Sequence, residues 1–374
     1  MTNSSSDIRP FRIEIAQADL DELADRLGRV RWANELPGAG TGYGVPVERV
    51  KALVEYWTDG YEWRAWEAKL NSYPQFTTTI DGQNVHFIHV KSPEPDAFPL
   101  IMTHGWPGSV VEYLDVIGPL TDPRSHGGDP SAAFDLVIPS IPGFAFSGPT
   151  SERGWNRYRV ARAWATLMER LGYERYGAVG NDGGSFIAPE LGRVAPDRVA
   201  GVHVTQIFSF PSGDPAEFAG LSEADQAALA HLQWFTDTMS AFGALQAQQP
   251  QTLAHALADS PVGLLGWNGQ LLAGLDPDFV LTNVMIYWLT GTSASAMRFY
   301  YEDAHADEHP TEPTTVPLGL ASFAGDFKSV RRFAERDHKS IVSWNEYDRG
   351  GHYAAHEAPD LLTADIRGFF ASLR

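Results

Sequence analysis

Short apolar runs that alternate with helical segments constrain the fold of this chain most strongly. The runs "LIMTH", "FDLVIPS", "YGAVGN" and "VAGVHV" have the length and composition of buried strands, and "YRVARAWATLMERLG" between two of them has the apolar spacing of a helix. Strand character resumes near the C-terminus with "PLGLASF" and "SIVSWN". This alternation predicts an α/β fold with a mostly parallel sheet.

Two regions depart from the alternation and give the expected domain organisation. Residues 1–95 combine a helical arm, from Phe11 to Tyr73, with the hairpin "FTTTI" and "VHFIHVK", which should form an antiparallel edge of the sheet. Residues 211–310 have no strand signal and are predicted to form a helical lid over the carboxyl edge of the sheet. The α/β core then comprises residues 96–210 and 311–374.

Composition excludes several classes of partner. The formal net charge of −19 disfavours nucleic acid and anionic membrane surfaces. The chain has no cysteine, which removes disulfides and thiolate-bound metals and fits a reducing cytoplasm. Neither a secretory leader nor an apolar run long enough to span a membrane is evident, so a soluble cytoplasmic protein is expected, with a homodimer left open.

The segment "GAVGNDGGSF" places a carboxylate at the apex of a glycine-rich corner. Gly180 to Gly184 match the spacing of a nucleophile elbow, the strained strand-to-helix turn that lifts one side chain above the sheet, and the apex residue is Asp182. The following helix should keep this carboxylate ionised. Two other interpretations are a helix N-cap and a dinucleotide-binding loop, but the spacing is not that of the latter.

A second corner, "THGWPGS", follows the strand "LIMTH". It can hold a cis peptide before Pro107 and direct the Trp106 amide toward the Gly183 amide, so that the two form an oxyanion hole. A plain Pro-Gly turn is the alternative.

A base and its acidic partner are predicted farther along the chain. His352 in "DRGGHYAAHEAPDLL" lies between a strand and a helix, and Asp326 in "FAGDF" follows an earlier strand. Nucleophile, acid and base then occur in the order typical of α/β-hydrolases. The cluster His305, Asp307, Glu308 and His309, and also His356, lack the spacing of a helical zinc site, so a solvated acidic loop is favoured and no metal is expected.

Several of these segments together resemble the microsomal-type epoxide hydrolases. The resemblance rests on "HGWPGS", "GNDGGS", "LTNVMIYWLTGTSASAMRFYYED" and "DRGGHYAAHEAPDLL", and it extends to the N-terminal segments "RPFRIEIAQADLDELADRLGRVRW" and "YPQFTTTIDGQNVHFIHVKSP". It implies an α/β-hydrolase that uses no cofactor. By position, the resemblance implies that Asp182 is the nucleophile, His352 the base and Asp326 its acidic partner. It also implies that Tyr300 is a lid tyrosine that binds the epoxide oxygen, and that the Trp106 and Gly183 amides form the oxyanion hole.

The chain departs from the family pattern in the residues around the substrate. Gly183 stands where the family usually has an aromatic residue, and Phe242 in "AFGALQ" occupies the place of a second lid tyrosine. Tyr301, Tyr287 or Trp234 could supply the missing hydrogen-bond donor. Trp234, Phe242 and Phe186 are predicted to contact the substrate, and the aromatic lid favours a bulky or aromatic epoxide, from natural-product biosynthesis or from a xenobiotic.

An aspartate nucleophile suits this chemistry, because a carboxylate that attacks the sp³ carbon of an epoxide forms an ester that water can hydrolyse to a diol. Two other functions remain open from the sequence. A haloalkane dehalogenase shares the nucleophile and base but needs halide-binding Trp or Asn donors. A non-catalytic binding module is the other, and the intact set of Asp182, Asp326 and His352 argues against it.

Overall fold

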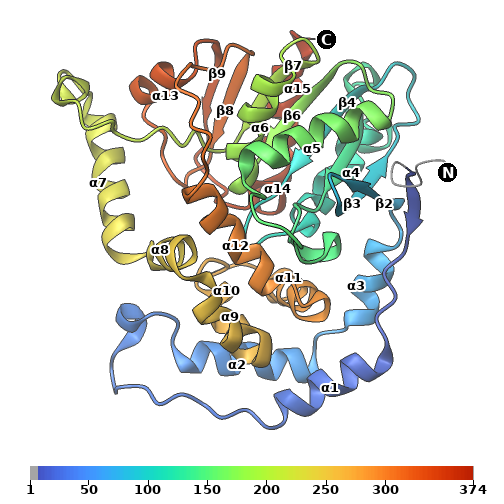
Figure 1. Cartoon of the computed structure of the whole chain (residues 1–374), viewed down its shortest axis with the longest axis vertical. Coiled ribbons are helices and arrows are strands. Elements are labelled where there is room, and N and C mark those ends of the chain that lie inside the picture. Colours follow the sequence, from blue (N-terminus) through green and yellow to red (C-terminus); the bar gives the residue numbers. More distant parts are fainter. Residues whose placement is uncertain (1–6, 374) are drawn as a thin grey trace.

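The computed structural model describes residues 7–373, and its centre is one sheet of nine strands (Figure 1). The strands are β1 (Arg9–Phe11), β2 (Gln75–Ile80), β3 (Gln83–Val90), β4 (Phe98–Thr103), β5 (Phe134–Pro139), β6 (Tyr176–Gly180), β7 (Val199–Val204), β8 (Leu318–Ser322) and β9 (Ile341–Glu346). Their order is β1-β2-β3-β5-β4-β6-β7-β8-β9. The pairs from β5 to β9 are parallel, which confirms the predicted fold class.

The antiparallel edge of the sheet is one strand longer than predicted. The hairpin β2–β3 forms as expected, with β3 antiparallel to β5. Arg9–Phe11 adds β1 outside β2, so the prediction that a helix begins at Phe11 was wrong. Three residues that include a proline carry no alternating pattern, and their strand conformation depends on the pairing with β2.

Among the helices of the core, two pairs pack against each other. Their bounds are α4 (Leu114–Thr121), α5 (Arg157–Arg170), α6 (Gly183–Val194), α13 (Arg331–Asp337), α14 (Ala354–Glu357) and α15 (Pro359–Ala371). Helix α5 packs against α6, and α4 packs against α15. Phe369 and Phe370 of α15 fill the space that Gly177 and Gly201 leave on β6 and β7, so large and small residues interlock there.

The lid enters between β7 and β8 and is helical, as predicted. It consists of α7 (Glu223–Thr238), α8 (Ala241–Gln248), α9 (Pro250–Asp259), α10 (Pro261–Gly269), α11 (Pro277–Thr290) and α12 (Ser293–Ala304). Helix α12 packs on α8 and α9, and these three helices lie below the sheet in Figure 1, with α7 at its side. The carboxyl ends of the parallel strands face this lid, which is where an α/β sheet binds its ligand.

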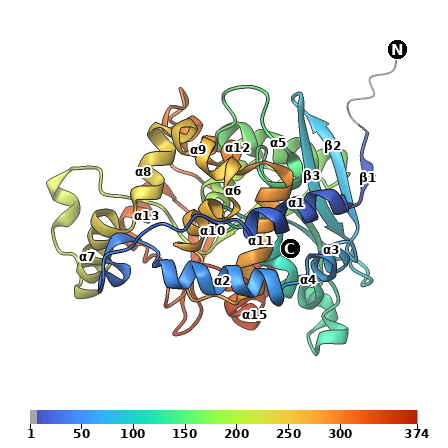
Figure 2. The same ribbon diagram turned by 90° about the horizontal axis from the view of Figure 1, so that it is seen from below.

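The N-terminal arm supports the lid from the side away from the sheet. Its helices are α1 (Gln17–Leu27), α2 (Val47–Asp59) and α3 (Trp63–Leu70), and Figure 2 shows α1 and α2 running across α10 and α11. The Tyr61 hydroxyl lies 3.0 Å from that of Thr282, and the Trp57 indole nitrogen lies 3.2 Å from the Met285 sulfur. Among the described residues, no helix is both long and apolar enough to cross a membrane.

Candidate active site

Asp182 stands at the sharp turn between β6 and α6. Its φ is 52° and its ψ is −117°, a conformation that L-residues rarely adopt. A Cβ at Gly180 would lie 2.1 Å from the Gly184 carbonyl oxygen, and a Cβ at Gly184 would lie 1.9 Å from that of Thr103. The Asp182 side chain makes no capping hydrogen bond to α6, so it does not act as an N-cap. The glycines therefore permit a turn that frees this carboxylate.

The corner that contains Trp106 meets the Asp182 carboxylate directly. The Trp106–Pro107 peptide is cis, and the Trp106 amide donates to Asp182 Oδ1 over 2.9 Å. A Cβ at Gly105 would lie 2.0 Å from the same oxygen and 2.4 Å from the Gly183 amide nitrogen. Both amides predicted for the oxyanion hole thus lie at one carboxylate, and only glycine at 105 permits this approach.

His104 keeps the corner in place. Its Nδ1 donates to the Gly105 carbonyl, and its Nε2 accepts from the Ile141 amide over 3.3 Å. Burial lowers the pKa of His104 to about 4, so the ring is neutral and can accept this bond. This role of His104 does not follow from the local sequence motif.

His352 joins the two aspartates. Its Nδ1 lies 2.9 Å from Asp326 Oδ1, and its Nε2 lies 3.5 Å from Asp182 Oδ2. Burial disfavours the charged imidazole, but the charges of Asp326 and Asp182 outweigh that effect and hold the pKa of His352 well above its usual range. Burial also opposes ionisation of Asp326, yet His352 and Gln206 keep the pKa of this carboxyl below its usual value. In the free site the charged imidazole therefore pairs with both carboxylates, with the His352 side chain 31% and the Asp182 side chain 21% exposed.

Gln206 is a site residue that the sequence analysis missed. It is fully buried after β7, and its Oε1 accepts from the Asp182 amide and from the Ser185 hydroxyl, each over 2.9 Å. Its Nε2 donates to Asn181 Oδ1 and to Asp326 Oδ2. One amide therefore links the backbone of the elbow to the acid that orients His352. Its position directly after a strand at the carboxyl edge was the available signal.

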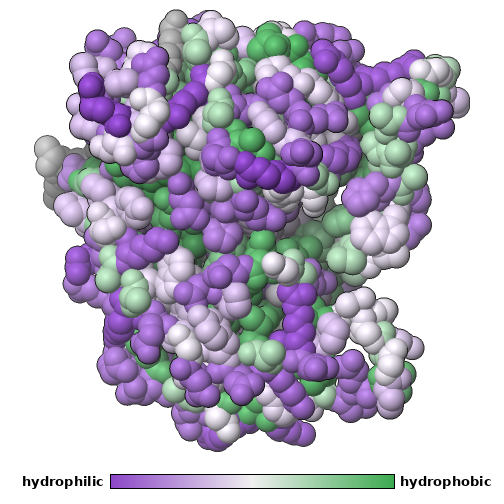
Figure 3. All heavy atoms as spheres, turned by 180° about the vertical axis from the view of Figure 1, so that it is seen from behind, coloured by the Kyte–Doolittle hydropathy of each residue, from purple (hydrophilic) through white to green (hydrophobic). Residues whose placement is uncertain are grey.

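A cavity of about 700 Å³ lies between these residues and the lid. Trp234, Phe242, Phe186 and Tyr300 all line it, together with Asp182, Asp326 and His352. The Tyr300 ring is edge-on to Trp106, with centroids 6.2 Å apart. Burial, and then the charge of Asp182, raises the pKa of Tyr300 well above its usual range, so this hydroxyl keeps its proton. Figure 3 shows a hollow with hydrophobic residues around it beside the column formed by α7, which carries Trp234.

Phe242 is adjacent to Tyr300. Their ring centroids are 6.1 Å apart, and Phe242 also stacks on Trp106 at 5.9 Å. Of the other candidate donors, Tyr287 donates its proton to the Gly108 carbonyl over 2.7 Å, and Tyr301 is 38% exposed and stacks on His305. Trp234 lines the cavity but is 51% exposed. Tyr300 is thus the hydroxyl best placed in the cavity among these residues.

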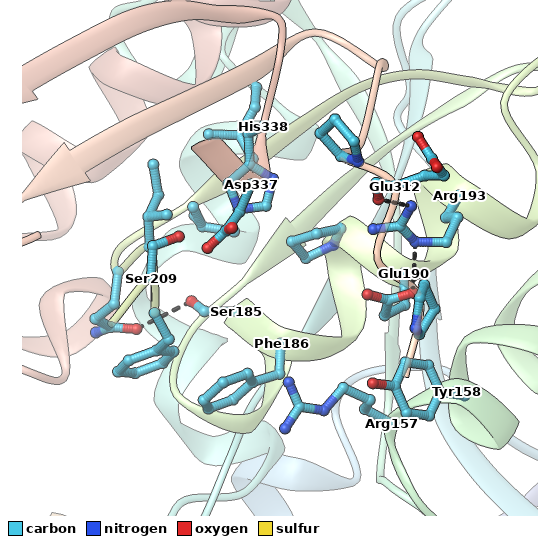
Figure 4. Close-up of a pocket in the computed structure, with 18 of the residues that line it drawn as sticks. Arg157, Tyr158, Ser185, Phe186, Glu190, Arg193, Ser209, Glu312, Asp337 and His338 are labelled. Carbon is cyan, nitrogen blue, oxygen red and sulfur yellow. Dashed lines mark hydrogen bonds and ion pairs between the residues drawn. The ribbon is translucent and has the colours of Figure 1, made fainter. Parts of the chain in front are cut away.

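A second, polar pocket of about 270 Å³ lies behind Phe186 (Figure 4). Phe186 and Phe208 stack at 4.3 Å and line both spaces. The Arg157 guanidinium lies 4.2 Å from the Phe186 ring and pairs with Asp303, three residues beyond Tyr300. This ion pair ties α12 to the core beside the site.

The predicted acidic loop is exposed. His305, Asp307, Glu308 and His309 all lie at the surface, and Glu308 pairs with Arg162. His356 lies 2.9 Å from Asp115 and stacks on Phe279. Within residues 7–373, no group of three or more histidine or acidic side chains is arranged to hold a metal ion.

Comparisons with known proteins agree with this geometry. The family model "Epoxide hydrolase N terminus" matches residues 8–113, and that of the "alpha/beta hydrolase fold" matches residues 99–268. The chain is 40% identical to a Stigmatella aurantiaca protein named "Putative epoxide hydrolase" over 98% of its length and 86% of that protein's. It is 33% identical to Epoxide hydrolase 1 of Sus scrofa, over 98% of this chain and 89% of the other.

The chain belongs to the epoxide hydrolase family. The crystal structure of juvenile hormone epoxide hydrolase from Bombyx mori superimposes with a TM-score of 0.89 at 26% identity, covering 98% of this chain and 95% of that one. The family predicted from the sequence motifs is therefore confirmed. These similarities do not favour the dehalogenase alternative.

Proposed function

We propose that this epoxide hydrolase opens a bulky or aromatic epoxide through a covalent ester on Asp182. The observation that carries the proposal is the environment of one carboxylate: Oδ1 accepts from the Trp106 amide, while Oδ2 lies 3.5 Å from His352. This leaves Oδ2 to attack the epoxide carbon. Oδ1 then becomes the ester carbonyl oxygen, already at the amides that stabilise a tetrahedral oxyanion.

Ring opening requires an acid at the epoxide oxygen. Tyr300 supports this role, because it lines the same cavity as Asp182 and its raised pKa keeps the hydroxyl protonated. The hydroxyl donates to the oxygen as that atom becomes an alkoxide. A single tyrosine hydroxyl then stabilises the charge of the alkoxide, since Phe242 beside it has no hydroxyl.

Ester formation converts His352 into a base. Asp182 loses its negative charge when it becomes an ester, and that charge contributes to the raised pKa of His352. The pKa of the imidazole therefore falls and its proton passes to the alkoxide formed by ring opening, so the ring is neutral when a water must be deprotonated. Asp326, held by Gln206, continues to orient the ring.

The cavity supports the expected substrate class. Its wall includes Trp106, Phe186, Phe208 and Phe242, so a flat or bulky apolar group can contact rings on several sides. A cytoplasmic location also belongs to this proposal and is supported by the cysteine-free sequence.

The function is tested by comparing the turnover of styrene oxide with the turnover of a bromoalkane of similar size. We expect release of the vicinal diol from the epoxide and no release of bromide. Bromide release with no diol would replace this function with dehalogenation.

A further inference from the structure

Two buried polar atoms lie beside the catalytic pair without a partner. Glu112 Oε2 and the Tyr353 hydroxyl make no hydrogen bond within residues 7–373. Glu112 is 1% exposed and Tyr353 is 2% exposed, so bulk water does not satisfy them. Buried polar groups of this kind in native proteins are usually hydrogen-bonded to an ordered water.

Both side chains approach the same point, at Gly108. A Cβ built on Gly108 would lie 2.7 Å from Glu112 Oε2 and 3.2 Å from Cε1 of the Tyr353 ring. The Gly108 carbonyl is already used, because it accepts from the Tyr287 hydroxyl. The Tyr113 hydroxyl lies beside the Glu112 carboxyl but donates to the Thr103 carbonyl over 2.8 Å. The two unpartnered atoms therefore remain for a small polar ligand.

Both atoms belong to residues that lie next to the groups needed for ester hydrolysis. Glu112 Oε1 accepts from Asn181, the residue before Asp182, over 3.3 Å. Tyr353 follows His352, and its ring is edge-on to the imidazole with centroids 5.0 Å apart. Glu112 and Tyr353 thus contact the neighbours of the nucleophile and of the base.

The protonation state of Glu112 depends on the charges of the catalytic groups His352 and Asp182. Burial raises the pKa of Glu112 to about 8, while the charge of His352 lowers it and that of Asp182 raises it. At neutral pH the carboxyl is therefore able to donate as well as accept a hydrogen bond. Burial and the nearby charge of Asp182 also raise the pKa of Tyr353, which keeps its proton.

We propose that Glu112 and Tyr353 hold the water that His352 activates for hydrolysis of the Asp182 ester. This inference rests on the proposed function. The water gives one proton to His352 Nε2 while its oxygen bonds to Cγ of Asp182, and the ester C–O bond then breaks. The departing alkoxide takes the proton from His352, which yields the diol. The acid left on Asp182 then gives its remaining proton to His352, which restores the imidazolium and the carboxylate of the free site. Glu112 and Tyr353 are positioning residues, since they act through the water.

The test separates ester formation from ester decay in Tyr353→Phe. This variant removes only a hydroxyl that lacks a protein partner, so a purely structural tyrosine should tolerate it. In single-turnover reactions with styrene oxide, followed by intact-protein mass spectrometry, ester formation should stay within about twofold of wild type. Ester decay should slow about tenfold, as expected for the loss of one hydrogen bond to the water. Tyr176→Phe is the matched control, because Tyr176 is also buried with an unpartnered hydroxyl, and both of its rates should be unchanged.

Glu112→Gln supplies an independent variant that keeps the side-chain volume and the acceptor for Asn181. It should also slow decay without slowing formation, and the double variant should be no slower than the worse single variant, because both changes affect one water. Wild-type decay in Tyr353→Phe, or equal slowing of both steps, would overturn the water site. An ester that never forms in the wild-type protein would instead contradict the proposed function.

Discussion

At the carboxyl edge of the sheet the site is built from backbone contacts that leave no room for one added carbon atom, whereas the lid surrounds the cavity with side chains. Gly105 and Gly184 each have a neighbour within 2.0 Å of a built Cβ. In the lid, Phe242 and Tyr300 contact each other and Trp106 at ring separations of 5.9 to 6.2 Å. We therefore expect the edge to fix the chemistry, and the lid to adjust which epoxide is accepted and how fast it opens.

Gly184→Ala should give the largest effect, because its Cβ would lie 1.9 Å from the Thr103 carbonyl oxygen. We expect a loss of at least ~3 kcal/mol in the free energy of unfolding, measured by chemical denaturation. Gly183→Ala is the control, since its Cβ would meet nothing closer than 3.4 Å and the amide is retained. Equal stability of the two variants would contradict the close backbone packing at the carboxyl edge.

His352→Gln should separate the two half-reactions. Only ester hydrolysis needs a base, so hydrolysis should slow by roughly 10²–10⁴-fold while the ester still forms. Intact-protein mass spectrometry should then show a mass gain equal to that of the epoxide. His356→Gln, which changes a histidine paired with Asp115 rather than Asp182, should turn over normally. Normal turnover by His352→Gln would exclude it as the base.

Tyr300→Phe tests the contribution of the lid to ring opening. The loss of a hydrogen bond to a developing alkoxide is worth about 1.5–3 kcal/mol, so ester formation should slow by roughly 10- to 150-fold in single-turnover experiments. Tyr301→Phe, at the neighbouring position outside the cavity lining, should leave this rate unchanged. If Tyr300→Phe formed the ester at the wild-type rate, another group would have to donate to the epoxide oxygen.

Phe242→Tyr should have the smallest effect, and it should raise the rate of ring opening where Tyr300→Phe lowers it. A hydroxyl beside Tyr300 offers a second donor to the alkoxide, so ring opening of small epoxides should quicken by less than about tenfold. The rate of ester formation is the measurement. No change would mean that Phe242 serves only in lid packing.

The sequence allowed prediction of those site residues whose position follows from a local motif. Asp182 is at the apex of a glycine corner, and Asp326 and His352 each follow a strand, so strand order alone placed them at one edge. Gln206 also follows a strand and could have been found in this way, but Glu112 and Tyr353 could not. Their roles depend on which loops meet, such as the contact of Glu112 with Asn181, 69 residues away along the chain.

The same limit applies to the fold. The buried strands were predictable from continuous apolar runs, as in β6, whose five residues are all buried. Strand β1 was not, because its pattern is mostly exposed and its conformation is defined only by pairing with β2, some 65 residues later. Local pattern therefore predicts elements with their own buried face, and tertiary contact decides the others.

The central claim is that the oxygen bonded to the substrate carbon comes from Asp182, and one isotope measurement tests it directly. With enzyme in excess over epoxide in water enriched in the heavy oxygen isotope, the diol from the first turnover should be largely unlabelled. The peptide that contains "GNDGG" should gain the label, because hydrolysis cleaves the acyl side of the ester. A labelled first diol with an unlabelled Asp182 would show direct attack by water and contradict the covalent mechanism.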